Sequence, residues 1–166
     1  MQKSLTRVLF VSKSGAARAL LAQACLGQLG AATFQVYSCG EPGSIAPKAD
    51  STTMAALSTA GFKTNELAPK DWKEFSRSGA KPMDIVIALD AQSAEEHPIW
   101  PGQPETALWD YAPLDKRKGE SESAHDLRVI QALHSLRRRI ELLISLRNKV
   151  KHHSELRHDL RDMAHL

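Results

Sequence analysis

The feature that most constrains the fold is an apolar run followed by a short loop of small residues and a helix-forming segment. Residues 8–11, Val-Leu-Phe-Val, form the run, and the loop 12–17 separates it from Arg18 and an Ala- and Leu-rich stretch. A strand, a tight loop and a helix in this order aim backbone N–H groups at an anion on the helix N-terminus. Gly15 permits the positive φ that such a loop requires, and Arg18 supplies a two-pronged donor for phosphate-like oxygens. The segment therefore predicts an oxyanion-binding loop.

Short apolar runs alternate with helical periodicity along the rest of the chain. Strands are expected at residues 6–12, 33–38, 84–89 and 106–111. Helices are expected at residues 17–29, 47–60, 70–77, 91–97 and 123–147. The last helix is amphipathic, with an apolar face made of Leu127, Ile130, Leu133, Leu136, Ile140 and Leu143. Strands that alternate with helices predict an α/β fold, here a three-layer αβα domain around a four-stranded parallel sheet.

The carboxyl ends of the parallel strands should meet at one edge of the sheet, where such folds bind ligands. The loop after the first predicted strand lies there. Cys39, Asp90, Asp110 and Tyr111 stand at the ends of the other three strands, so we expect these side chains to line a cleft around the loop. Cys39 could be a reactive thiol, but small buried cysteines usually serve packing, which is the interpretation we favour.

Length, composition and charge limit the class of protein. A chain of 166 residues with 42% hydrophobic and 25% charged residues suits one soluble globular domain. No apolar stretch approaches the roughly 18 residues that span a bilayer, and the early apolar run is too short for a signal peptide. Two cysteines provide no disulfide framework. We therefore expect a cytoplasmic protein without membrane association, and a net charge of +3 does not by itself predict nucleic-acid binding.

The loop has a sequence counterpart in a known family. In the family pattern V-L-F-[VL]-C-x-x-N-x-[CA]-R-S, Ser12 stands at the Cys, Gly15 at the Asn, Ala17 at the small position and Arg18 at the Arg. This segment resembles the active-site loop of the low-molecular-weight protein tyrosine phosphatases and the thioredoxin-coupled arsenate reductases. The resemblance implies that the loop binds a phosphate-like anion through Ser12, Lys13, Ser14, Gly15, Ala16, Ala17 and Arg18.

Further motifs match the same family in the same order. Residues 36–44 resemble its second strand and S-A-G turn, and residues 84–89 resemble its D-[LI]-[VI]-[IV] strand. Residues 94–102, AEEHPIWPG, resemble A-E-E-C-P-x-[FW]-P-G of the arsenate reductase branch. The resemblance implies a phosphatase-like domain of flavodoxin-like topology at residues 1–147, followed by a C-terminal helical extension at residues 148–166.

The departures from the family pattern fall on its chemistry. Family enzymes attack with a thiolate, whereas the Ser12 hydroxyl would need an adjacent general base, and the loop contains no His or carboxylate. The family's catalytic Asp falls on Pro113, and the two further cysteines of the reductase branch fall on Asp90 and His97. An introduced Cys-to-Ser change would explain Ser12 and none of the other departures.

These departures predict a pseudoenzyme that keeps a phosphate-binding loop. It would bind a phosphate-like anion or a phosphorylated ligand, act in binding or regulation, and need no cofactor. Asp90 could instead fill the anion site with its own carboxylate, and Asp110 or Asp115 could replace the missing acid only if their loop is rearranged. The alternatives are an active tyrosine phosphatase or arsenate reductase, and an interaction module in which the loop is vestigial.

The C-terminal extension carries a narrow apolar stripe among charged residues, made of Leu156, Leu160 and Met163. Such a stripe is buried against its own domain, a second copy or a partner helix, so a homodimer or a protein partner is an alternative to internal packing. The extension also holds His152, His153, His158 and His165. Their spacing matches no standard metal site, so no metal is expected.

Overall fold

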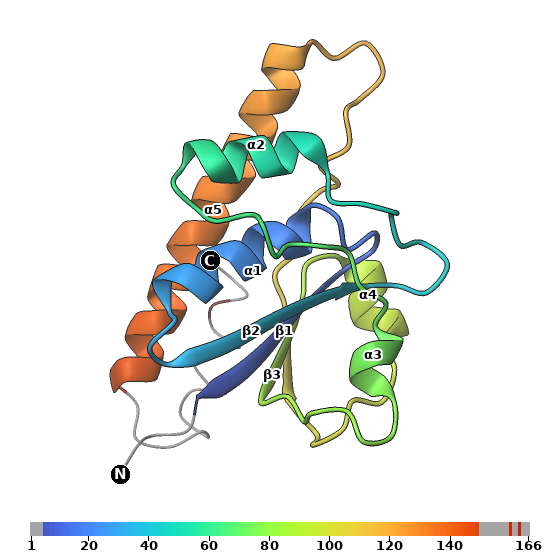
Figure 1. Cartoon of the computed structure of the whole chain (residues 1–166), viewed down its shortest axis with the longest axis vertical. Coiled ribbons are helices and arrows are strands. Elements are labelled where there is room, and N and C mark those ends of the chain that lie inside the picture. The colour runs from blue at the N-terminus through green and yellow to red at the C-terminus, as the bar shows by residue number, and fades with distance from the viewer. Residues whose placement is uncertain (1–4, 150–159, 161–162, 164–166) are drawn as a thin grey trace.

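The computed structural model of the protein describes residues 5–149 together with Leu160 and Met163. It contains a four-stranded parallel sheet with the order β2-β1-β3-β4 (Figure 1). The strands are β1 at Thr6–Ser12, β2 at Phe34–Gly40, β3 at Ile85–Ala88 and β4 at Glu105–Leu108. The predicted four-stranded parallel sheet is therefore confirmed.

Helices cover both faces of the sheet. They are α1 at Arg18–Leu29, α2 at Ser51–Thr59, α3 at Lys73–Ser76, α4 at Ala91–Glu96 and α5 at Glu122–Lys149. Figure 1 shows α1, α2 and α5 on one side of the sheet and α3 and α4 on the other. This arrangement is the predicted three-layer αβα fold.

The continuous apolar run of β1 is explained by burial on both faces of the sheet. Val8 and Phe10 pack in the large apolar cluster under α1 and α5, whereas Leu9 and Val11 pack in a second cluster with Phe75 of α3. Successive side chains of a strand point to opposite faces, so a central parallel strand is apolar at every position.

Several predicted boundaries differ from the structure. The helix expected from residue 47 begins at Ser51, because the Asp50 carboxylate caps it by accepting a 2.9 Å hydrogen bond from the Thr53 amide. The second strand runs on to Gly40, because its pairing with β1 continues up to Ser12, which stands opposite Gly40. The fourth strand ends at Leu108 instead of residue 111.

The predicted apolar face of α5 is confirmed from Leu133 onward, whereas the prediction is wrong for Leu127 and Ile130. Leu127 and Ile130 are 54% and 37% exposed, and Val129 is buried in their place. The N-terminal part of α5 extends beyond α1 and contacts the small residues of α2, so fewer side chains are covered there (Figure 1).

Two residues of the C-terminal apolar stripe lie within the domain core. Leu160 and Met163 are buried in the same cluster as the inner faces of α1 and α5. Leu156 and the four histidines of the extension lie outside the described residues. Within the described part of the chain, every helix is too short or too polar to cross a lipid bilayer.

Candidate oxyanion-binding site

The loop at residues 12–18 connects the carboxyl end of β1 to the N-terminus of α1, and close backbone contact with β2 fixes its shape. Gly15 has a φ of +68°, and a Cβ built there would lie 3.0 Å from the backbone nitrogen of Gly40. A Cβ at Gly40 would in turn lie 2.8 Å from the backbone nitrogen of Gly15. The two glycines therefore allow a backbone approach that any side chain would obstruct.

Hydrogen bonds from the neighbouring segment hold the loop through its carbonyl groups. The Lys13 carbonyl accepts from the Glu41 amide at 3.0 Å, and the Ser14 carbonyl accepts from the Ala46 amide at 3.1 Å. The Ala16 carbonyl accepts from the Asp50 amide, also at 3.0 Å. Because these three carbonyls are engaged, the loop keeps its conformation while residues 13–18 use only the Lys13 and Ala16 N–H groups for hydrogen bonds to described residues.

Most of the loop N–H groups are unpaired with protein. No described residue accepts a hydrogen bond from the amides of Ser14, Gly15, Ala17 or Arg18. Gly15 and Arg18 are buried residues. A buried amide without an acceptor is costly, and unpaired amides at the start of a helix are the usual donors to a bound oxyanion.

Ser12 lies where β1 meets this loop. Its side chain is 1% exposed, and its Oγ has no hydrogen-bond partner among the described residues. A general base must lie within about 3.2 Å of the proton that it removes, directly or through one water molecule. The described structure places no His or carboxylate in direct contact with the hydroxyl.

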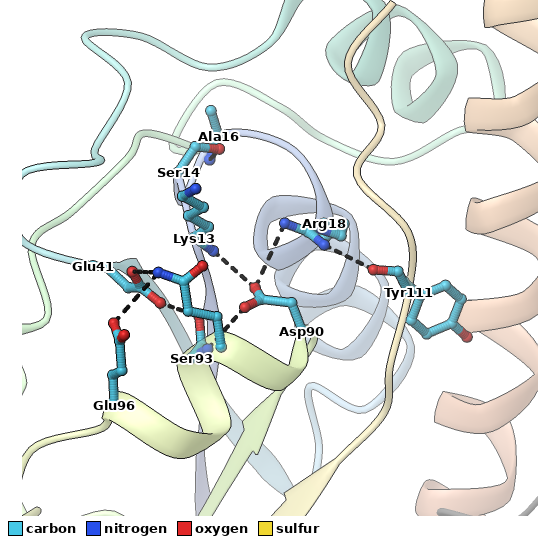
Figure 2. Close-up of polar contacts among 10 residues, drawn as sticks. Lys13, Ser14, Ala16, Arg18, Glu41, Asp90, Ser93, Glu96 and Tyr111 are labelled. Atoms are coloured by element: carbon cyan, nitrogen blue, oxygen red, sulfur yellow. Dashed lines mark hydrogen bonds and ion pairs between the residues drawn. The ribbon is translucent and has the colours of Figure 1, made fainter. Parts of the chain in front are cut away.

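The Arg18 guanidinium is held in place by two contacts, whereas most of the loop amides have no acceptor among the described residues (Figure 2). Its side chain is buried, and Nη1 donates to the main-chain carbonyl of Tyr111 at 2.7 Å. Nη2 lies 3.5 Å from Oδ2 of Asp90. A buried arginine that is fixed by two partners is pre-organised to present its remaining donors to an anion.

Asp90 contacts the rim of the loop and leaves the other amides unpaired. Its Oδ2 accepts from the Lys13 amide at 2.9 Å, and its Oδ1 accepts from the Ser93 amide at 2.8 Å as the N-cap of α4. The carboxylate thus engages one amide of the loop together with Arg18 (Figure 2). Its observed contacts are those of a residue that anchors the arginine and starts a helix.

Glu41 is a buried carboxylate beside the loop that the sequence analysis did not single out. It is 4% exposed and accepts hydrogen bonds from Ser93 Oγ at 3.1 Å and Gln92 Nε2 at 3.3 Å (Figure 2). Burial raises the pKa of the Glu41 carboxyl above its usual value, and the Ser93 hydrogen bond opposes this rise. Its place directly after a predicted strand was the one sequence signal that could have identified it.

The structure brings Asp90 and Tyr111 to the loop, whereas no hydrogen bond or ion pair among the described residues joins the side chains of Cys39 and Asp110 to it. Cys39 is fully buried in the apolar cluster with Leu9 and Val11, and burial raises the pKa of its thiol. Asp110 is exposed, and none of the hydrogen bonds among the described residues joins its side chain to the loop. Cys39 therefore has the environment of a packing cysteine.

The segment that would carry the family's catalytic acid is fixed to α5. Arg128 Nη2 donates to the Asp115 carbonyl at 2.7 Å, and His125 Nε2 donates to the Leu114 carbonyl at the same distance. Arg128 also pairs with Glu120 at 2.6 Å and lowers the pKa of that carboxyl to about 2. The rearrangement that would bring Asp115 to the site would break these contacts.

Solved structures of related fold are arsenate reductases and tyrosine phosphatases. An arsenate reductase in its phosphate-binding state has a TM-score of 0.65 at 22% identity, over 85% of this chain and 98% of that one. An arsenate reductase from Archaeoglobus fulgidus has a TM-score of 0.62 at 20% identity, over 83% and 98%. The tyrosine phosphatase Wzb from Escherichia coli K30, in complex with sulphate, has a TM-score of 0.61 at 19% identity, over 84% and 99%.

These structural likenesses show the fold, and the sequence itself provides the family. No curated protein matches the chain at a significant level. The sequence model described as low molecular weight phosphotyrosine protein phosphatase matches residues 7–116, which include the loop, all of the sheet except Thr6, and Tyr111. The chain therefore belongs to the low molecular weight phosphotyrosine protein phosphatase family.

Proposed function

We propose that this protein binds a phosphate-like oxyanion, or a phosphorylated ligand, at residues 12–18 without turning it over, and that it acts by binding or regulation. The observation that carries the proposal is the contrast within one loop. Its amides and Arg18 are arranged as donors, whereas its first residue, Ser12, is buried and its hydroxyl contacts no base among the described residues. Donors without an activated nucleophile favour binding over catalysis.

Nucleophilic attack by Ser12 lacks both of the groups that it would need. A serine hydroxyl needs a neighbouring base, and the described residues provide none in contact with its Oγ. The leaving group would need an acid, and the segment around Pro113 is fixed to α5 through Arg128 and His125. Asp110 and Asp115 are both exposed, so neither is a buried acid facing the loop.

A disulfide relay is equally unsupported. Cys25 and Cys39 are free and buried on different faces of the sheet, in separate apolar clusters. Burial raises the pKa of Cys25 to about 12, so its thiolate fraction at neutral pH is negligible. The positions of the reductase cysteines hold Asp90 and His97, which cannot form disulfides.

The loop supports an oxyanion as the ligand class. Unpaired amides at the N-terminus of a 12-residue helix, together with a fixed guanidinium, match the tetrahedral oxygens of phosphate or sulphate. Two of the related structures are an arsenate reductase in a phosphate-binding state and a phosphatase in complex with sulphate. The same ligand chemistry is therefore proposed for this chain.

The proposal is tested by calorimetric titration of the protein with phosphate, arsenate and tungstate. Saturable binding is expected, and Arg18→Ala should weaken it by about 10- to 100-fold, because a charge-assisted contact contributes about 1.5–3 kcal/mol. Arg137→Ala is the matched control, since Arg137 lies on α5 and pairs with Glu141. Absence of binding, or equal binding by Arg18→Ala, would contradict the proposal, as would phosphatase activity that Ser12→Ala abolishes.

A further inference from the structure

Tyr111 contacts both the oxyanion loop, through Arg18, and α5, through Ser135. Its main-chain carbonyl accepts from Arg18 Nη1 at 2.7 Å. Its hydroxyl shares a 2.8 Å hydrogen bond with Ser135 Oγ of α5. Figure 2 shows the carbonyl facing Arg18 while the ring turns toward α5. The two ends of one residue thus contact the two elements separately.

A single arginine of α5 contacts the aromatic rings on both sides of Asp110. The Cζ atom of Arg139 lies 5.2 Å from the ring centroid of Tyr111 and 5.8 Å from that of Trp109. Trp109 is fully buried, and its amide donates to the Ala88 carbonyl at 2.9 Å, so its main chain is fixed at the end of β3. Arg139 therefore links a fixed ring to the ring of Tyr111.

Ser135 and Arg139 stand four residues apart on α5, so their side chains lie on one face of the helix. Ser135 holds the Tyr111 hydroxyl, and Arg139 covers the face of the ring. Cation–π contacts at the edge of a core are stronger than those at exposed sites because the charge is partly desolvated. The Tyr111 amide donates to the Leu89 carbonyl at 2.9 Å, and the two side-chain contacts add a restriction on the tilt of the ring and on the carbonyl that follows it.

We propose that Arg139 and Ser135 are positioning residues for the oxyanion loop, because they fix Tyr111, whose carbonyl fixes the Arg18 guanidinium. An arginine that is already held loses little side-chain freedom when an anion binds, which improves affinity. The position of Arg18 in the free protein follows from the contacts alone. The consequence for affinity rests on the proposed oxyanion-binding function.

The test compares the NMR signal of the Arg18 Nε–H group in Arg139→Gln with that in the parent protein, followed by titration of both with tungstate. We expect the Arg18 signal to shift and broaden in the free variant, and tungstate affinity to fall about three- to tenfold. Arg137→Gln is the matched control, since Arg137 is also on α5 and its Cζ lies 5.7 Å from the ring of Phe62, a residue outside the loop. The control should leave the Arg18 signal unchanged.

Milder variants cover the case in which Arg139→Gln does not fold. Tyr111→Phe and Ser135→Ala each remove the same hydrogen bond and keep the Tyr111 carbonyl, so each should move the Arg18 signal by a smaller and similar amount. An Arg18 signal that is unchanged in every folded variant would overturn the positioning role. A signal that moves, in a protein that binds no tungstate in any form, would support the positioning role and overturn the proposed function.

Discussion

The loop at residues 12–18 and the segment at residues 109–120 lie next to each other but differ in how their polar groups are used. In the first, the carbonyls of Lys13, Ser14 and Ala16 accept hydrogen bonds, and most amides have no acceptor among the described residues. In the second, the carbonyls of Pro113, Leu114 and Asp115 all accept hydrogen bonds from α5. The polar groups of the first segment are thus only partly used within the described part of the chain, whereas the second segment is fixed to α5.

This difference indicates that binding and turnover depend on separable parts of the fold. A family enzyme needs both a loop that holds the anion and a second segment that delivers a proton. Here the donors of the first segment are in place, while the second contributes a carbonyl, from Tyr111, that holds Arg18. The segment at the position of the family's acid-bearing loop thus contacts Arg18 through its main chain.

The largest expected effect comes from restoring a thiol to the loop with Ser12→Cys. The unpaired amides and the α1 N-terminus should lower the pKa of this thiol by about one to several units, whereas Cys25 and Cys39 are buried with raised pKa values. The ultraviolet absorbance of the thiolate, followed against pH, should therefore show a thiol in Ser12→Cys that ionises at least about one pH unit below the usual value near 8.5, and the parent protein should lack it. Bound tungstate should raise the pKa of this thiol, because a neighbouring anion opposes its negative charge.

Ser12→Cys also tests the role of the segment at residues 109–120. A thiolate in the loop without an acid in this segment should hydrolyse p-nitrophenyl phosphate poorly. Adding Pro113→Asp to Ser12→Cys should give little further activity while Arg128 and His125 hold the neighbouring carbonyls. Ionisation of the thiol at position 12 at or above its usual pKa, near 8.5, would show that the loop no longer favours negative charge. Efficient turnover by the single variant would show that the two segments are not as different as their contacts indicate.

The sequence predicted the parts of this comparison that depend on local patterns. The apolar run of β1, Gly15 and the helix that follows form one short stretch, and their order predicted the strand, the loop and the sheet around them. The partners of the loop could not be predicted in this way. Asp90 and Tyr111 reach it from 77 and 93 residues away, and contacts at such separations depend on packing.

Misjudged features also have physical reasons. Helical periodicity placed Leu127 and Ile130 in the core, but they are exposed because the first turns of α5 extend past the helices that cover its later part. The pairing of Arg128 with main-chain carbonyls had no sequence signal, since any arginine of α5 could have made it. Glu41 was overlooked because a single carboxylate after a strand does not reveal its burial.

A smaller effect is expected from releasing the second segment with Arg128→Gln. The variant should have a lower urea midpoint at pH 7, because it loses the contacts to Glu120 and to the Pro113 and Asp115 carbonyls. The pKa of Glu120 is lowered to about 2, so its contribution is present above its usual pKa, near 4.5, and is lost as the pH falls toward 2. The difference in urea midpoint between the parent protein and Arg128→Gln should therefore shrink as the pH falls from about 4.5 toward 2.

Lys116→Gln is the matched control for this measurement. It removes the more exposed Lys116–Glu122 pair from the same region, and such pairs contribute little to stability. Tungstate affinity should stay within about twofold in Arg128→Gln, because Tyr111 is held by contacts of its own. A large loss of affinity would show that the two segments act as one unit.

The smallest expected effect concerns the charge of Glu41. Its pKa is raised by burial, so its negative charge develops only as the pH rises through that raised value, and this charge opposes an anion in the neighbouring loop. Sulphate remains a dianion from pH 5 to 8, and its affinity for the parent protein should weaken about two- to threefold over that range. Glu41→Gln, titrated by calorimetry, should remove this weakening.

Glu95→Gln, a change at an exposed residue of α4, is the control and should preserve the weakening. If the pH dependence persists in Glu41→Gln, a group other than this carboxyl governs the charge of the loop.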